Sequence, residues 1–132
     1  LYQKLDLSIL YKQSQWVFYG MYSFVLFISI LKAVLFYIVI QLHLKLDLTK
    51  PFSNFVSTKI AQISHYTFSI GIISYIASQI AKSLLLQGYD VAKLSPFWVD
   101  SSAFILMAAI IYIISVIFKR GIALQEENEL TI

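Results

Sequence analysis

The sequence predicts an all-α integral membrane helical bundle, and three observations support that fold class. Hydrophobic residues make up 59% of the chain and charged residues only 13%, about half the charged share of a soluble domain. The mean hydropathy is +0.77. Three mostly apolar stretches, about 16–44, 60–86 and 97–118, meet the roughly 20 residues that a helix needs to cross hydrocarbon. We therefore expect residues 1–132 to form one membrane domain with three transmembrane helices.

The first stretch, about 16–44, contains Lys32, which is followed by eight uncharged residues before Gln41. An ionisable residue at membrane depth is by default a candidate functional residue. Alternatively, Lys32 lies one or two turns from a headgroup region and extends its ammonium group to it. A buried Lys32 would need a partner from a missing segment, another subunit or a lipid phosphate. Asp100, at the far end of the third stretch, is expected to be a poor partner.

Residues 45–59 are predicted to form a cytoplasmic turn between the first two spans. Pro51 cannot continue a preceding helix but suits the first turn of a new one. From Phe52 onward, apolar residues recur at helical spacing, which predicts that the second helix begins as an amphipathic piece at the membrane surface. These residues are Phe52, Phe55, Val56, Ile60 and Ile63.

Small and polar residues line one face of each of the second and third spans. At 100° per residue, those of the second span fall within an arc of about 140°; they are Ser64, Thr67, Gly71, Ser74, Tyr75, Ser78, Gln79 and Lys82. The corresponding residues of the third span are Ser101, Ala108, Tyr112, Ser115 and Lys119. Such stripes indicate close helix packing in membranes. A substrate path is the less favoured alternative.

An outside loop, 87–96, is predicted between the second and third spans, with Gly88 as a helix stop and Pro96 as a helix start signal. We expect the third span and the tail to form one helix from about Phe97 to about Asn128. Lys119 and Arg120 would then lie at the cytoplasmic headgroups.

The predicted cytoplasmic tail, 119–132, contains three acidic residues near its end, and the last three residues alternate between apolar and polar. Glutamates oppose the negative end of a helix, so the helix should fray by about Asn128. The last three residues alternate as in an extended strand. We expect the terminal segment to be held against protein, either near Pro51 and Phe52 or by a partner; it comprises Glu129, Leu130, Thr131 and Ile132.

Three spans place the two ends of the chain on opposite sides of the membrane, and the basic residues favour a cytoplasmic C-terminus. The side that holds the 45–59 turn and the C-terminus contains Lys45, Lys50, Lys59, Lys119 and Arg120. The other side contains Lys4, Lys12, Lys82 and Lys93.

Several classes of function are excluded or disfavoured. The chain has no cysteine, which excludes disulfides and thiolate metal sites. The net charge of +3 is spread along the sequence, which argues against direct nucleic-acid binding. His43 and His65 are isolated from carboxylates, so an interface role is favoured over a metal pair or a pH switch. We find no catalytic constellation or phosphate-binding glycine loop, and expect no enzyme activity and no cofactor.

Two segments carry a resemblance to a known family. "IFKRGIALQEENELTI" and the turn "LKLDLTKPFSNF" resemble the bacterial domain of unknown function 2975 family, small membrane proteins with four spans. In that family a basic pair leads into a polar stretch that ends in an acidic or Asn residue, Leu-Thr and a branched residue. The family's Lys/Arg-rich stretch after the Pro-Phe turn is represented here only by Lys59.

The resemblance implies that the three spans are the family's second to fourth, with the first lying before Leu1, that residues 1–15 end an outside loop, and that the C-terminus is cytoplasmic. Family genes often lie beside one for a small helix-turn-helix regulator, and no biochemical activity is established for the family.

Three functional hypotheses follow. The first is a non-enzymatic protein of the bacterial inner membrane that signals to, or sequesters, a cytoplasmic regulator through its turn and tail, with a role in stress or peptide immunity. The second is an accessory or structural subunit of a larger membrane complex, which would explain an unpaired Lys32 and stripes on more than one helix. The third is a small-molecule or ion path. The partners expected are the lipid bilayer and a protein.

Overall fold

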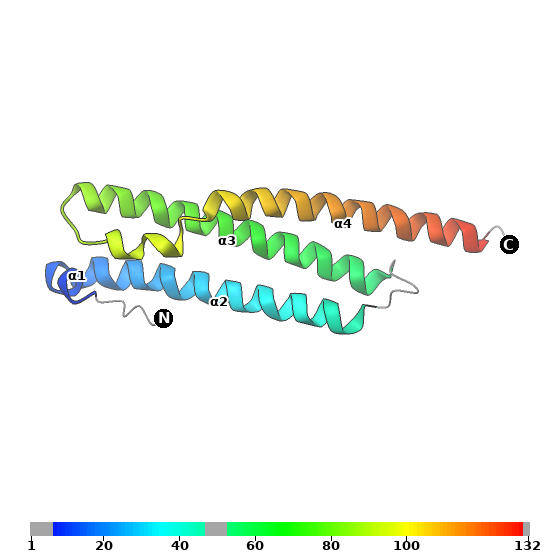
Figure 1. The fold of residues 1–132 in the computed structure, drawn as a ribbon, viewed down its shortest axis with the longest axis horizontal. Coiled ribbons are helices and arrows are strands. Elements are labelled where there is room, and N and C mark those ends of the chain that lie inside the picture. Colours follow the sequence, from blue (N-terminus) through cyan, green and yellow to red (C-terminus); the bar gives the residue numbers. More distant parts are fainter. Residues whose placement is uncertain (1–6, 47–52, 131–132) are drawn as a thin grey trace.

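The protein is an all-α bundle in which three long helices lie side by side (Figure 1). The computed structural model describes residues 7–46 and 53–130. In chain order the elements are α1 (Ser8–Gln13), α2 (Gln15–Lys45), α3 (Asn54–Leu86), the 3₁₀ helix η1 (Ala92–Phe97) and α4 (Ser101–Leu130). Three helical segments, which correspond to α2, α3 and η1 with α4, are long and apolar enough to cross a membrane. The predicted fold class is confirmed.

Serine side chains cap the first two long helices. The Val17 N–H donates to Ser14 Oγ at 3.4 Å, and the Val56 N–H donates to Ser53 Oγ at 3.2 Å. Each contact satisfies one of the N–H groups that a helix leaves without a partner in its first turn. The predicted turn residues Pro51 and Phe52 lie between these helices, outside the described residues.

The first turns of α3 pack inside the bundle and do not form a separate surface piece. The apolar face expected to lie on a membrane surface is buried, with Val56 2% exposed and Ile60 8% exposed. It continues without a break into a helix of 33 residues. The apolar periodicity therefore predicted a helix correctly. The expectation that this helix would lie on the membrane surface is wrong, because its apolar face is covered by protein.

Helix α3 is the central element. It packs against α2 on one side and α4 on the other, whereas α2 and α4 make no close backbone contact within the described ranges. Helices α3 and α4 approach closely at Gly71, where an added Cβ would lie 2.6 Å from Ile105 Cγ1 and 3.2 Å from the Ser101 carbonyl oxygen. Further along the same seam, Ser64 Oγ donates to the Ala108 carbonyl oxygen at 3.2 Å. Small side chains thus allow these two helices to lie in contact.

The chain that follows α3 folds back along the bundle. Gly88 adopts a φ of +93°, a left-handed conformation that glycine reaches without a Cβ clash. Residues 92–97 then form η1, which runs back beside α3 (Figure 1). Val91, Leu94 and Trp98 are almost fully buried in a core cluster whose other members come from α1, α2 and α3: Leu10, Met21, Val25, Ile28, Ala77 and Ala81.

This packing changes two expectations from the sequence. Residues 87–96 are not simply a loop, since six residues from Ala92 form η1. Helix α4 begins at Ser101 and not near Phe97. Pro96 lies within η1, where its missing N–H disfavours a longer α-helix, and burial of Trp98 holds the following turn against the core.

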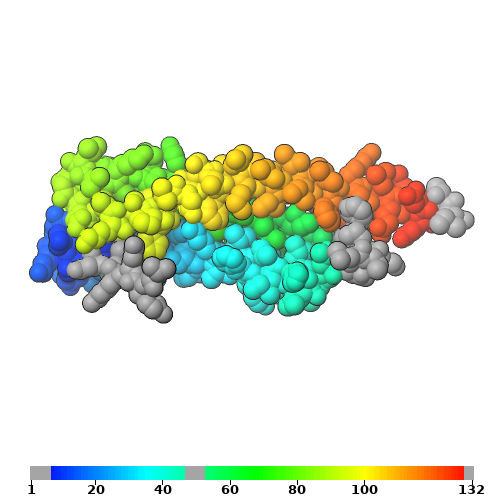
Figure 2. All heavy atoms as spheres, in the orientation of Figure 1, coloured from blue at the N-terminus to red at the C-terminus, as the bar shows by residue number. Residues whose placement is uncertain are grey.

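Helix α4 extends past the other two long helices at its C-terminal end (Figures 1 and 2). Since Ser64 lies opposite Ala108 and the helices are antiparallel, Lys119 is level with the start of α3. The helix continues to Leu130, so the prediction that Leu130 is extended is wrong. Unfavourable interactions of exposed glutamates with a helix end amount to only about 0.3–1 kcal/mol each. Thr131 and Ile132 lie outside the described residues.

Substitution of Gly71 tests the close approach of α3 and α4. Gly71→Ala should lower stability by about 1 to 3 kcal/mol, because the new methyl group overpacks the seam. Gly20→Ala is the matched control, since a Cβ there meets nothing within 4 Å and alanine favours the helix. Thermal unfolding of both variants in mild detergent is the measurement. Equal melting temperatures would contradict the described seam.

Candidate functional site

Lys32 lies near the middle of the bundle. It is 13 residues before Lys45, the last residue of α2, and 17 residues after Gln15, the first. At 1.5 Å per residue, these separations are about 20 Å and 26 Å along the helix axis. Its side chain is 30% exposed. Lys32 therefore lies far from both ends of a helix of membrane-spanning length.

Asp100 is the partner of Lys32. The Lys32 Nζ lies 3.6 Å from Asp100 Oδ2 and 5.1 Å from the centre of the Phe104 ring, within cation–π range. The sequence predicts Asp100 to be a poor partner, and this prediction is wrong. Because η1 runs back along α3, the turn before α4 lies midway along the bundle rather than at its end.

Two buried polar atoms have no hydrogen-bond partner among the described residues: Asp100 Oδ1, in the carboxylate of the ion pair, and Ser74 Oγ in α3. Ser74 is fully buried. An unsatisfied buried polar atom costs about 1 to 3 kcal/mol, so both atoms mark places where the bundle has kept polarity at a cost in stability. The Lys32–Asp100 pair thus places charge halfway along the bundle, and a charge at that depth is a common feature of functional positions in membrane helices.

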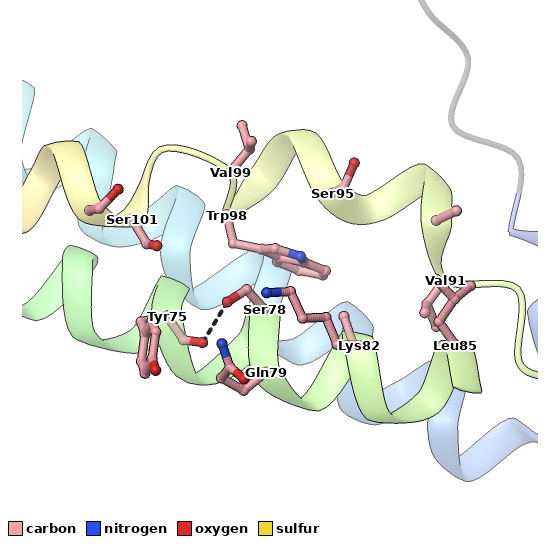
Figure 3. Close-up of a pocket in the computed structure, with 13 residues that line it drawn as sticks. Tyr75, Ser78, Gln79, Lys82, Leu85, Val91, Ser95, Trp98, Val99 and Ser101 are labelled. Atoms are coloured by element: carbon pink, nitrogen blue, oxygen red, sulfur yellow. Dashed lines mark hydrogen bonds between the residues drawn. The ribbon is translucent and has the colours of Figure 1, made fainter. Parts of the chain in front are cut away.

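A cavity of about 380 Å³ opens between the last turns of α3 and η1, at the end of the bundle opposite the tail (Figure 3). Its walls are apolar at Leu85, Val91 and Trp98 and polar at Ser78 and Lys82. The ammonium end of Lys82 is directed toward Trp98, away from Leu85. A side chain on a helix leans toward the helix N-terminus, which for α3 is toward the middle of the bundle.

The predicted stripe residues divide into two groups. Gly71, Ser74, Ala108 and Ser115 are buried, as are Ser64, Thr67 and Ser101. Tyr75 and Tyr112 are 53% and 56% exposed, and each lines a cavity on the α3–α4 face. Ser78 is partly buried and its hydroxyl donates to the Tyr75 carbonyl oxygen at 2.7 Å. The inner residues form the helix seam, and the outer ones form the walls of cavities.

Basic residues gather at the other end of the bundle. Lys45 and Lys59 lie 5.2 Å and 5.6 Å from the centre of the Phe55 ring, and Lys59 Nζ donates to Gln41 Oε1 at 3.0 Å. Lys119 and Arg120 are exposed on α4, and α4 passes this end (Figure 1). These cations form a belt where the three helices meet solvent or headgroups.

Beyond this belt, the last turns of α4 present an acidic surface. Glu126, Glu127 and Glu129 are exposed, and Leu124 on the same segment is 47% exposed. The side chains of Leu130, Thr131 and Ile132 are not among those described. The expectation that the terminal residues dock near Pro51 and Phe52 therefore lies outside the described part of the chain.

The fold and these sites define an all-α protein of the membrane-spanning type, with a charged pair halfway along its bundle. Residues 5–132 match the family described as Protein of unknown function (DUF2975), and the chain belongs to that family. The resemblance stated from the two sequence segments is confirmed. No curated protein and no solved structure matches the chain.

A double-mutant cycle tests the Lys32–Asp100 pair. Lys32→Leu and Asp100→Asn should each lower stability, because each leaves a charge without its partner. Removing one partner of a fully buried ion pair lowers the free energy of unfolding by roughly 3 to 5 kcal/mol. Since both side chains are partly exposed, we expect about 1 to 3 kcal/mol.

The double variant should cost less than the sum of the two single variants, and Lys32→Arg, which keeps the charge, should retain most of the stability. Thermal or denaturant unfolding in lipid-containing detergent measures the coupling. Strictly additive costs would show that the two side chains do not interact.

Proposed function

We propose that this protein is a non-enzymatic, multi-spanning protein of the bacterial cytoplasmic membrane that binds a cytoplasmic helix-turn-helix regulator through the end of α4. The observation that carries the proposal is the continuation of α4 past Arg120 to Leu130, beyond the ends of α2 and α3 (Figure 1). A helical segment that extends past the described ends of α2 and α3 offers a partner a preformed binding surface. A role in stress or peptide immunity belongs to the same proposal.

The chemistry of this segment supports a basic partner. Three exposed glutamates, Glu126, Glu127 and Glu129, lie within four consecutive positions of α4. Proteins that bind DNA carry basic surfaces, so an acidic helix can attract the same face that DNA uses. Binding there would hold the regulator at the membrane and away from its operator. The resemblance to a family whose genes lie beside those of such regulators supports this choice of partner.

The orientation in this proposal places the basic belt and the end of α4 in the cytoplasm. Lys45, Lys59, Lys119 and Arg120 lie at that end of the bundle, and short cytoplasmic segments carry an excess of Lys and Arg. The acidic surface then follows the belt into the cytoplasm. The C-terminus would be accessible to a cytoplasmic partner without any change in the membrane-spanning part.

An accessory role in a larger membrane complex is the second candidate. His65 is exposed although it lies within the membrane-length helix α3, and it lines a cavity of about 290 Å³ together with Phe68 and Tyr112. A polar ring facing lipid is unfavourable, whereas one facing another protein helix can be satisfied. Co-purification of a stoichiometric membrane subunit would favour this candidate over a regulator.

Cysteine labelling tests the orientation. Glu127→Cys in the natively cysteine-free chain should react with a membrane-impermeant maleimide only after the cells are broken, because the end of α4 is proposed to be cytoplasmic. Gln87→Cys, exposed at the opposite end, should react in intact cells. Labelling of the Glu127→Cys variant from outside intact cells would refute the orientation.

Reversing the charge of the three glutamates tests whether the acidic surface of α4 binds the regulator. Glu126→Lys, Glu127→Lys and Glu129→Lys together should reduce retention of the regulator roughly tenfold. Three exposed charge interactions at about 0.5 kcal/mol each total about 1.5 kcal/mol, and about 1.4 kcal/mol corresponds to a factor of ten in affinity. Purification in mild detergent with quantitative mass spectrometry of the retained proteins is the measurement. Deletion of residues 129–132 should also weaken retention while leaving membrane insertion intact.

Lys12→Glu and Gln87→Glu, exposed at the other end of the bundle, together serve as the control for altered charge and should retain the regulator. The proposal fails if the unmodified chain retains no regulator, or if the reversed and control variants retain it equally.

A further inference from the structure

Two cavities lie along the seam that α3 makes with η1 and α4, and the strip of surface that contains both is termed the groove. The larger, of about 380 Å³, is lined by Lys82, Tyr75 and Ser102, and the second, of about 290 Å³, by Phe68 and Ala109. Phe68, Tyr75 and Lys82 are each seven residues apart, as are Ser102 and Ala109. Residues seven apart lie on one face of a helix, so both cavities open on the same face of the bundle.

The groove has more polar side chains at the end beside η1 than at the other end. Serine hydroxyls and the Lys82 ammonium group line the end beside η1, together with the ring of Trp98 (Figure 3). The other end is lined by Phe68, Ile105, Ala108 and Ala109, together with Ser64, His65 and Tyr112. From Lys82 to Phe68 the groove is about 21 Å long, at 1.5 Å per residue. One leaflet of hydrocarbon is about 15 Å thick, half of a 30 Å core.

Lys82, the cation at this end of the groove, is an exposed residue of α3. Within the described residues, Lys82 makes no ion pair or hydrogen bond. Its side chain leans into the cavity toward Trp98 rather than toward the bundle end at Leu85. A cation that points into a cavity with hydroxyl-bearing walls is suited to a phosphate group, which accepts charge-assisted hydrogen bonds from Lys and Ser.

We propose that this groove binds an anionic phospholipid of the leaflet at the η1 end, with the lipid phosphate beside Lys82 and one acyl chain lying over Tyr75 toward Phe68 and Ala109. Charge complementarity selects the headgroup, because Lys82 is the cation of the polar cavity. The decrease in polar side chains along the groove from the η1 end matches the order of groups in a phospholipid. The lipid would support η1 against α3 by filling the space between them.

Native mass spectrometry of the full chain released from lipid nanodiscs tests this proposal. In nanodiscs of phosphatidylglycerol mixed with phosphatidylcholine, the unmodified protein should retain more phosphatidylglycerol than phosphatidylcholine. Lys82→Gln should lower that retention about fivefold, the equivalent of about 1 kcal/mol for one lysine near an anionic headgroup. Lys82→Arg should preserve it. Lys12→Gln, an exposed lysine on α1 at the same end of the molecule, is the matched control and should match the unmodified protein.

A second variant tests the apolar end and keeps the charge intact. Ala109→Trp fills the cavity over Phe68 and should weaken retention of dioleoyl phosphatidylglycerol more than that of the short-chain dihexanoyl lipid. Circular dichroism of each variant checks that the helices have formed. Equal retention by the Lys82→Gln and Lys12→Gln variants would overturn the proposal, as would an equal effect of Ala109→Trp on both lipids. Displacement of the long-chain lipid by inorganic phosphate alone would show a free-phosphate site and overturn the lipid assignment.

Discussion

A charge halfway along a membrane-length helix needs a partner at the same depth, and the Lys32–Asp100 pair satisfies this requirement. Helix α2 makes no close backbone contact with α4 in the described ranges, although it does contact η1. The Lys32 side chain, which contacts Asp100 and Phe104, therefore adds a direct connection between α2 and the start of α4. The position of Asp100 in turn depends on η1. If the third long helix began at the end of the bundle, Asp100 would lie far from Lys32 along the bundle axis.

The fold-back of η1 is compatible with hydrocarbon because its backbone groups are satisfied locally. In lipid, irregular backbone is tolerated only where its N–H and C=O groups have partners or line a cavity. The Trp98 and Val99 N–H groups donate to the Ser95 carbonyl oxygen, at 3.2 Å and 3.0 Å, and the Ser101 N–H donates to the Trp98 carbonyl oxygen at 3.3 Å. Burial of Trp98 and Leu94 then attaches the segment to α2 and α3. The turn that carries Asp100 is thereby fixed from both sides.

Local patterns in the sequence were enough to predict the three long helices and the small-residue faces that pack where α3 meets α4. Apolar length predicted the three spans, and the spacing of small residues around Gly71 and Ala108 placed them on facing surfaces. The partner of Lys32 could not be found this way, because its position depends on tertiary packing of a short non-α segment. One signal was available: Val91, Leu94 and Trp98 are three and four residues apart, a spacing that indicates a buried face. Pro96 concealed it, because it indicated the start of the third span and so placed residues 87–96 in a loop before that span.

The two ends of the bundle have different chemistry. At one end, α4 passes the basic belt and continues as an acidic helix. At the other, η1 and α3 enclose a cavity with Lys82 in its wall. Both features belong to the same chain segment on either side of Asp100.

The most direct test of this account is the distance between Lys32 and Asp100 in a lipid bilayer. Solid-state nuclear magnetic resonance can measure the dipolar coupling between a ¹⁵N-labelled Lys32 Nζ and a ¹³C-labelled Asp100 carboxyl carbon in the full chain. In the structure Lys32 Nζ lies 3.6 Å from Asp100 Oδ2, which predicts a clear coupling between the labelled nitrogen and the labelled carboxyl carbon. Absence of the coupling in a protein whose helices are intact would show that Lys32 extends to a headgroup region, and would contradict the role assigned to Asp100.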